Sequence, residues 1–251
     1  NETMIETADL YTWSELVSPE ETLTDEAITS IEDDKLPIHQ IGDEFTISGT
    51  GEDSNGNYID DSKISVCVDS IQIADDLQLF DQDHVPEKLL AEVGEDGKLI
   101  DNTLSYVKSG DGINSVDEIV KTENVKQKLI YATVTYTNRS DEEITHMLYL
   151  GSLMLLKHEN GIYEIYDPGD QSGNGFDRVI WSGGEKTPEM QYYRGNYISS
   201  LKPDESVQVD MAWIVNESDL DHMYLNINGD GAAYEFSDAT LKMGLVDIFQ
   251  Q

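Results

Sequence analysis

The sequence predicts an antiparallel β-sandwich over residues 38–251, preceded by an acidic extension over residues 1–37. Two observations predict this fold. From Ile41 onward, several segments alternate apolar and polar residues, which is typical of strands with one buried face. Asn-Gly and Asp-Gly pairs lie between these segments, and such pairs supply the positive φ angles that two-residue hairpins require. The pattern predicts about eight to ten short strands, as in a sandwich.

Four segments show the clearest strand pattern, and they define the expected core. They are residues 45–47, 130–136, 207–215 and 223–227. The longest apolar run, Met147–Leu156, is half the length of a membrane span and is predicted to be a buried strand. The residues expected in the core are Phe45, Ile47, Val66, Val68, Ile130, Val134, Tyr136, Leu153, Val207, Val209, Met211, Trp213, Leu225 and Ile227.

Two short helices are expected between the strands. Residues 85–93 predict one or two helical turns that start at Pro86. Ser115-Val116-Asp117-Glu118 matches a capping box, which predicts a short helix through about Val120.

The extension over residues 1–37 carries eleven acidic residues against one base, Lys35. Ser18-Pro19-Glu20-Glu21 is a helix-start signature, and it predicts a short amphipathic helix over about 19–32. The alternative is a solvated tether, and we expect a tether with transient helix that folding does not require. The opening Asn1-Glu2-Thr3 favours a mature chain whose leader was removed, with an arbitrary boundary as the alternative.

The composition indicates a folded and strongly acidic protein. The chain has 251 residues, of which 38% are hydrophobic, and 51 acidic residues against 15 basic ones produce a net charge of −36. A chain of this length can bury roughly 70% of its extended surface, so most of it is expected to fold. The charge repels phosphate backbones and anionic membrane surfaces, which excludes nucleic-acid binding and membrane-surface adsorption. We expect a monomer.

Motifs for catalysis and cofactor binding are absent from the sequence. The glycine spacings around Gly173 and Gly183 fit neither a dinucleotide-binding loop nor a phosphate-binding loop. The five histidines lack zinc-ligand spacing, and no nucleophile elbow occurs. The single cysteine, Cys67, excludes an intrachain disulfide and is expected to behave as a small buried hydrophobe. We therefore assign no catalytic residue and expect no cofactor.

A weak calcium candidate lies in the polar segment that begins at Asp53. Asp53, Asn55 and Asp60 offer oxygen ligands, but Lys63 stands where an EF-hand loop needs glutamate. A polar hairpin turn at Asn55-Gly56 is the favoured interpretation, so we expect no metal.

Aromatic and arginine side chains gather in the loop-rich stretch 167–200, which is the candidate ligand-binding region. Flat aromatic surfaces beside arginines are enriched in recognition loops for sugars and proteins. The alternative is a loop whose aromatic residues fill the core. The candidate residues are Phe176, Arg178, Trp181, Tyr192, Tyr193, Arg194 and Tyr197.

Two segments carry recognisable motifs. In residues 128–143, a predicted strand is followed by Thr137-Asn138-Arg139-Ser140-Asp141-Glu142, which has the pattern T-N-x-S/G-D-E. The segment Leu201-Lys202-Pro203-Asp204-Glu205 has the pattern L-x-P-G-E, with aspartate in place of glycine. Together they resemble a family of uncharacterised immunoglobulin-like domains from lipoproteins of Gram-positive bacteria. The resemblance covers about 125–230, with a central strand pair over 153–166, whereas the stretch 75–126 is longer than the family implies.

The resemblance implies an immunoglobulin-like sandwich that is secreted or anchored at the cell surface through a lipidated cysteine upstream. It implies no activity, because these domains have no established function. We therefore expect a non-catalytic extracellular module that binds an unknown protein or glycan. The alternatives are a glycan-active hydrolase with a carboxylate pair near residues 167–200, and a structural spacer.

Overall fold

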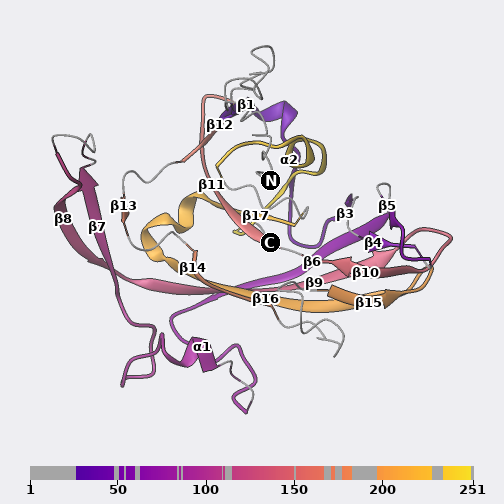
Figure 1. Cartoon of the computed structure of the whole chain (residues 1–251), viewed down its shortest axis with the longest axis horizontal. Coiled ribbons are helices and arrows are strands. Elements are labelled where there is room, and N and C mark those ends of the chain that lie inside the picture. The colour runs from indigo at the N-terminus through magenta and orange to yellow at the C-terminus, as the bar shows by residue number, and fades with distance from the viewer. Residues whose placement is uncertain are drawn as a thin grey trace, which may run out of the picture.

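The computed structural model describes residues 27–47, 51–53, 55–59, 63–83, 85, 87–108, 110, 115–149, 151–166, 171–172, 177–182, 197–227 and 234–249. Strands dominate these residues, which confirms an all-β protein (Figure 1). The α-helices in the described part of the chain are the single turn α1 (Glu87–Leu90) and the short α2 (Asp238–Met243). None of the described helices is long and apolar enough to cross a membrane.

One layer is a five-stranded antiparallel sheet. Its strands, in spatial order, are β14 (Asp177–Ser182), β16 (Ser206–Asn216), β9 (Gln127–Asn138), β6 (Ile64–Ala74) and β3 (Glu44–Ile47). The long central strands β16 and β9 pair along their whole length, from Ser206 opposite Thr137 to Asn216 opposite Gln127. Alternating valine, tyrosine and tryptophan residues suit these strands, because β-branched and aromatic side chains pack well on a pleated surface.

Two further sheets supply the strands that complete the core. A six-stranded sheet has the order β1 (Ser30–Glu32), β12 (Ile162–Ile165), β11 (Ser152–Glu159), β17 (Met223–Asn226), β18 (Leu245–Asp247) and β2 (Ile38–His39). Its β18–β2 pair is parallel and its other pairs are antiparallel. A four-stranded sheet has the order β15 (Tyr197–Leu201), β10 (Ile144–Leu148), β4 (Gly51–Glu52) and β5 (Tyr58–Ile59).

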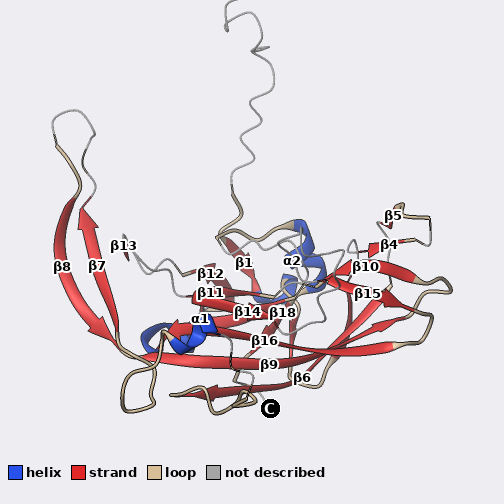
Figure 2. Cartoon of the chain, turned by 60° about the horizontal axis from the view of Figure 1, so that its bottom comes forward, coloured by secondary structure: helices blue, strands red, loops and turns tan. Residues whose placement is uncertain are grey.

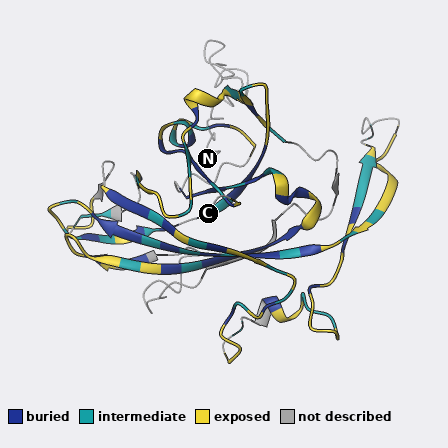
Figure 3. Cartoon of the chain, turned by 180° about the vertical axis from the view of Figure 1, so that it is seen from behind, coloured by how far each residue is buried: buried dark blue, intermediate teal, exposed yellow. Residues whose placement is uncertain are grey.

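The main core lies between the five-stranded sheet and these two sheets (Figure 3). Trp213 and Tyr136 from the first layer and Leu153 and Leu225 from the second are fully buried in it. The expected core is confirmed except that Phe45 and Val207 are half-buried, although both pack against the same cluster. The apolar residues of the alternating segments therefore face the core as predicted.

The apolar run Met147–Leu156 is divided between two sheets. Strand β10 ends at Leu148, and β11 starts at Ser152. Gly151 lies at the crossing, where an added Cβ would approach Met211 Sδ to 2.8 Å and Trp213 Cζ2 to 2.9 Å. Only glycine allows the backbone to pass this close to the core.

The long stretch between β6 and β9 forms two separate features. Residues 75–101, with α1, cover the outer face of the five-stranded sheet, where Leu77, Phe80 and Leu89 pack against Leu129 and Ile214. Strands β7 (Asn102–Lys108) and β8 (Glu118–Val125) then form an antiparallel hairpin that projects away from the rest of the chain (Figures 1 and 2). We call residues 102–125 the arm. The two-residue strand β13 (Gln171–Ser172) pairs with β7.

The helix expected from Ser115 to Val120 is wrong, because Glu118–Val125 is strand β8 and pairs with β7. Ile119, Val120, Thr122 and Val125 are β-branched and favour an extended backbone. Their cross-strand partners outweigh the local capping box. The turn expected near residues 85–93 is confirmed as α1.

The domain boundary expected at residue 37 also differs from the structure. Strand β1 pairs with β12, with Ile31 opposite Tyr163, so the helix expected over 19–32 does not extend through Ser30–Glu32. Leu36 is buried against Met154 and Phe236 in a third apolar cluster. The folded part thus includes residues 30–37, because β1 pairs with β12 and Leu36 is buried in this cluster. Residues 1–26 lie outside the described residues.

Candidate functional site

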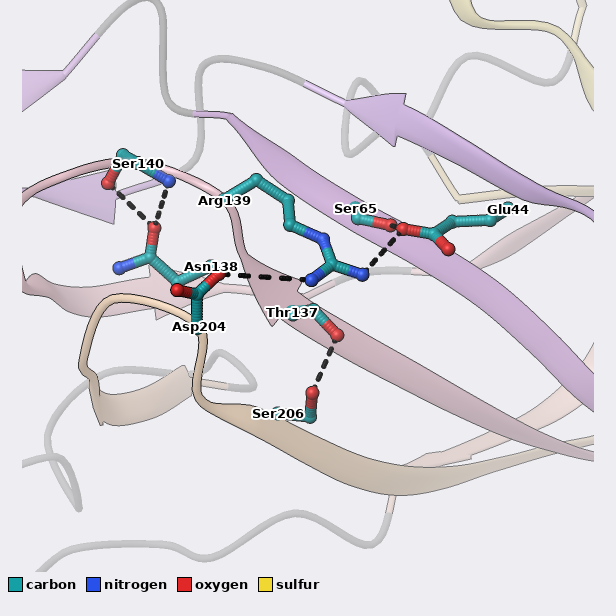
Figure 4. A network of polar contacts seen from close by, with 8 residues as sticks. All are labelled: Glu44, Ser65, Thr137, Asn138, Arg139, Ser140, Asp204 and Ser206. Carbon is teal, nitrogen blue, oxygen red and sulfur yellow. Dashed lines mark hydrogen bonds and ion pairs between the residues drawn. The ribbon is translucent and has the colours of Figure 1, made fainter.

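The first of the two resemblance segments forms a buried corner around Asn138 (Figure 4). The side-chain amide of Asn138 donates to the carbonyl oxygens of Glu142 and Leu201 at 2.7 and 2.8 Å. Its Oδ1 accepts from the backbone N–H and the hydroxyl of Ser140 at 2.8 and 2.6 Å. Asn138 therefore holds the turn after β9 against the end of β15, which is a structural role.

The second segment forms a tight turn next to this corner. The Glu205 N–H donates to the Lys202 carbonyl at 2.9 Å, with Pro203 at the second position and Asp204 at φ 59° in the third. This is the pattern of a type II turn, whose third position favours glycine. Arg139 contacts Glu44 at 2.9 Å and Asp204 at 3.9 Å. These side chains pair with one another, so the resemblance segments mark a scaffold.

The calcium candidate is a polar turn in the part of the site that the structure describes. The Asp53 carboxylate accepts from the backbone N–H of Asn55 at 2.8 Å, from the backbone N–H of Asn57 at 2.9 Å and from the Asn57 amide at 2.8 Å. The hydrogen bonds from Asn57 lower the pKa of Asp53. Asp60 lies outside the described residues, and the described residues contain no group of three or more His, Cys, Asp or Glu side chains placed to hold a metal.

The aromatic candidates are placed in part. Arg178 and Trp181 lie on β14, whereas Tyr197 lies on β15 in a different sheet. Phe176, Tyr192, Tyr193 and Arg194 lie outside the described residues, so the recognition loop and its carboxylate alternative stay predictions. The same stretch supplies β13, in which Gln171 lies opposite Tyr106 of the arm. The structure therefore brings the start of the predicted loop against the arm.

Cys67 is half-buried in β6, and burial, followed by the nearby Asp69 carboxylate, raises the pKa of its thiol. A raised pKa keeps the thiol protonated at neutral pH, and the protonated form is a poor nucleophile. The geometry therefore supports a structural cysteine.

Three apolar side chains near the free end of the arm are exposed to solvent. Val116 is 85% exposed, Ile119 62% and Val120 58%. The register of β7 with β8 shifts between Tyr106 and Val107, and this bulge leaves Val120 without a cross-strand partner next to Ile119. We call Val116, Ile119 and Val120 the arm tip.

The two faces of the arm differ in charge. On one face, the Lys121 ammonium lies 4.5 Å from the centre of the Tyr106 ring, and the Tyr106 hydroxyl donates to Glu123. This hydrogen bond raises the pKa of Tyr106 to about 12. By the strand register, the other face carries only uncharged residues, namely Thr103, Ser105, Val107, Ile119, Thr122 and Asn124. Across that face, the Thr103 hydroxyl donates to Asn124 at 2.9 Å.

Buried polar side chains fix the base of the arm to the rest of the chain. The Asn102 amide donates to Asn216 Oδ1 at 2.9 Å, and the Asn216 amide donates to Asp219 at 3.3 Å. The Gln127 amide donates to the Ile100 carbonyl at 2.6 Å. Burial raises the pKa of the Asp219 carboxyl. Satisfied buried networks of this kind hold one geometry, so the arm starts from a defined anchor.

A cavity of about 240 Å³ lies beside this base, and three of its six charged side chains, Asp75, Lys98 and Lys128, form ion pairs. Lys128 contacts Asp75 and also Glu217, the latter at 3.0 Å, and Lys98 lies 3.9 Å from Asp75. Hydrogen bonding from Lys128 is the main cause of the lowered pKa of Asp75. These pairs tie the 75–101 cover to β9. The cavity is lined by Asp75, Asp96, Lys98, Leu99, Asp101, Lys126, Gln127 and Lys128.

The sequence predicted no functional residue in the arm, only a short helix over residues 115–120. Two signals were available: the unexpected length of residues 75–126, and the β-branched residues that follow the capping box. The bulge at Val120 breaks the alternation of β8, which hides the strand from a period-two pattern.

Comparison with known proteins adds no family or function, since no family model, no curated protein and no solved structure matches this chain.

Proposed function

We propose that this protein is a non-catalytic binding module whose recognition element is the arm. The observation that carries the proposal is the exposure of three neighbouring aliphatic side chains, Val116, Ile119 and Val120, at the end of a projecting hairpin. Large apolar side chains that are exposed together mark contact surfaces, because their burial against a partner removes them from water.

The attachment of the arm supports the same proposal. The buried Asn102–Asn216–Asp219 network and Gln127 anchor the base, whereas residues 115–122 are exposed. A recognition element on an ordered anchor loses less conformational freedom when it binds. Strand β13 lies beside β7, so the sequence-predicted recognition stretch starts at the arm.

The proposal extends to the fold family and to the compartment. An immunoglobulin-like sandwich is supported by the mainly antiparallel layers around the main core and by the Asn138 and Asp204 segments. Display at the cell surface, through a lipid anchor or by secretion, rests on the resemblance of those two segments to lipoprotein domains. Fractionation of the source cells, with protease treatment of intact cells, tests this location directly.

A binding screen with two matched variants tests the role of the arm. The test variant is Val116→Ser/Ile119→Ser/Val120→Ser, and the control is Ile73→Ser/Ile162→Ser, which changes exposed isoleucines elsewhere. The immobilised proteins are exposed to glycans, cell-wall fragments and purified extracellular proteins. We expect a ligand that wild type and control retain and that the test variant binds at least about tenfold more weakly. A ligand held equally by all three proteins contradicts the proposal. Unchanged melting temperatures serve as the folding control.

A further inference from the structure

Resting on the proposed function, we infer that the partner of the arm tip is a cationic protein segment, in which Lys or Arg residues flank aliphatic side chains. Three features of the arm select this partner: the chemistry of its tip, the charges next to the tip, and the irregular edge of β8.

The exposed surface of the tip is aliphatic. Val116, Ile119 and Val120 are all β-branched, and the described residues of the arm end, 115–122, include no aromatic side chain. Aliphatic side chains gain mainly from burial against other apolar side chains, which protein segments offer. Sugars are recognised mainly through aromatic stacking and convergent hydrogen bonds, and the tip offers neither.

The charged side chains beside the tip carry a net negative charge, which favours a cationic partner. Asp117 and Glu118 directly precede Ile119, and both are exposed. One cation, Lys108, lies opposite Glu118 in the strand register. The one basic residue of β8, Lys121, forms an ion pair with the Glu123 carboxylate and lies over the Tyr106 ring. The chain as a whole carries a net charge of −36. Its long-range field attracts cationic partners and raises their association rate, and the local carboxylates fix their orientation.

The same features disfavour a second copy of this chain. Two copies would bring two net charges of −36 together. The bulge at Val120 interrupts the outer edge of β8, and Lys121 lies on that edge next to it. Bulges and edge lysines are features that oppose edge-to-edge pairing of strands.

Short synthetic peptides of three kinds test this partner class. The first alternates lysine with valine and isoleucine, the second replaces each lysine with glutamate, and the third keeps lysine but replaces the aliphatic residues with serine. Fluorescence anisotropy measures each affinity at about 50 and about 300 mM NaCl. We expect the first peptide to bind best and to weaken with salt. We expect Val116→Ser/Ile119→Ser/Val120→Ser to weaken it at least about tenfold.

A matched pair of charge variants separates local from global electrostatics. Asp117→Asn/Glu118→Gln and Glu159→Gln/Glu164→Gln each remove two exposed carboxylates, the first pair beside the tip and the second on the β11–β12 hairpin. We expect the first variant to bind the lysine peptide severalfold more weakly than wild type, and the second to bind it with the wild-type affinity within measurement error. Equal losses in both variants overturn the inference, because they indicate attraction to net charge alone.

The remaining outcomes separate this inference from the proposed function. If the glutamate peptide binds as tightly as the lysine peptide, or sedimentation equilibrium shows a dimer that the tip variant abolishes, the cationic partner is overturned. The cationic partner is also overturned if no peptide binds while a ligand from the binding screen requires the tip. In each of these cases the arm remains the recognition element. If the ligands from the screen bind the tip variant as tightly as wild type, the proposed function itself is overturned.

Discussion

The fully buried side-chain amide of Asn138 makes four hydrogen bonds. Replacement with alanine leaves the carbonyl oxygens of Glu142 and Leu201 without this donor and removes the acceptor for Ser140. We predict that Asn138→Ala lowers the free energy of unfolding by about 2–4 kcal/mol. Urea denaturation measures the loss. Asp204→Gly is the control, and it should leave stability within about 0.5 kcal/mol, because glycine suits the positive φ at this turn. A loss below about 1 kcal/mol for Asn138→Ala would contradict a structural role for the motif.

Tyr136 carries a buried polar atom that the fold does not use. Its hydroxyl is inaccessible to water and has no hydrogen-bond partner among the described residues, and burial raises its pKa well above the ordinary value. Because an unsatisfied buried hydroxyl is destabilising, we predict that Tyr136→Phe raises the free energy of unfolding by about 1 kcal/mol. Thermal and urea unfolding both report this change. A loss of stability would show that the hydroxyl makes a contact in solution.

Asp219 links stability to pH in a defined direction. Burial raises its folded-state pKa above the unfolded value, so its favourable contribution is complete below the unfolded pKa. That contribution is lost as the pH rises through the folded pKa. We predict that Asp219→Asn, which stays neutral and still accepts from Asn216, is more stable than wild type at pH 7. The advantage should shrink as the pH falls toward about 4. A constant advantage across this range would exclude titration of Asp219 as its cause.

At the scale of elements, residues 30–37 belong to the folded part: Ser30–Glu32 is an edge strand of the six-stranded sheet, and Leu36 packs in an apolar cluster with residues of that sheet. Leu36 is buried against Met154, Phe236 and Leu245, whereas its neighbour Lys35 is exposed. We predict that Leu36→Ala costs about 2–5 kcal/mol of stability. The matched change Lys35→Ala should cost less than about 0.5 kcal/mol. Equal effects of the two substitutions would support the original prediction of a tether that extends to residue 37. Chemical denaturation of both variants provides the comparison.

At the scale of the whole molecule, charge repulsion dominates the electrostatics. The folded chain holds 51 acidic residues against 15 basic ones, and expansion on unfolding relieves their repulsion. Because salt screens exposed charges, we predict that the melting temperature rises by a few degrees between low salt and about 0.3 M NaCl.

About 1 mM calcium at matched ionic strength should raise the melting temperature no further, because the Asp53 carboxylate accepts hydrogen bonds from Asn55 and Asn57. A calcium-specific increase would revive the site at Asp53, Asn55 and Asp60.

The sequence by itself determined the β-rich fold and most of the core. Alternation from Val207 to Val215 places Trp213 inside, because one buried face imposes a period of two on any strand. The Asn160-Gly161 hairpin was predictable for a local reason as well: both residues adopt positive φ angles, at 54° and 77°, which these residue types tolerate. These features depend on the residue and its immediate neighbours.

Only the tertiary structure decided the features that depend on distant partners. Ile31 becomes a strand residue because Tyr163 lies opposite it, and β8 forms because β7 pairs with it despite a local capping box. The buried anchor of the arm joins Asn102 to Asn216, which are 114 positions apart in the chain. Long-range pairing and burial contribute more free energy than local propensity, so segments of mixed local preference take the structure that their spatial neighbours stabilise.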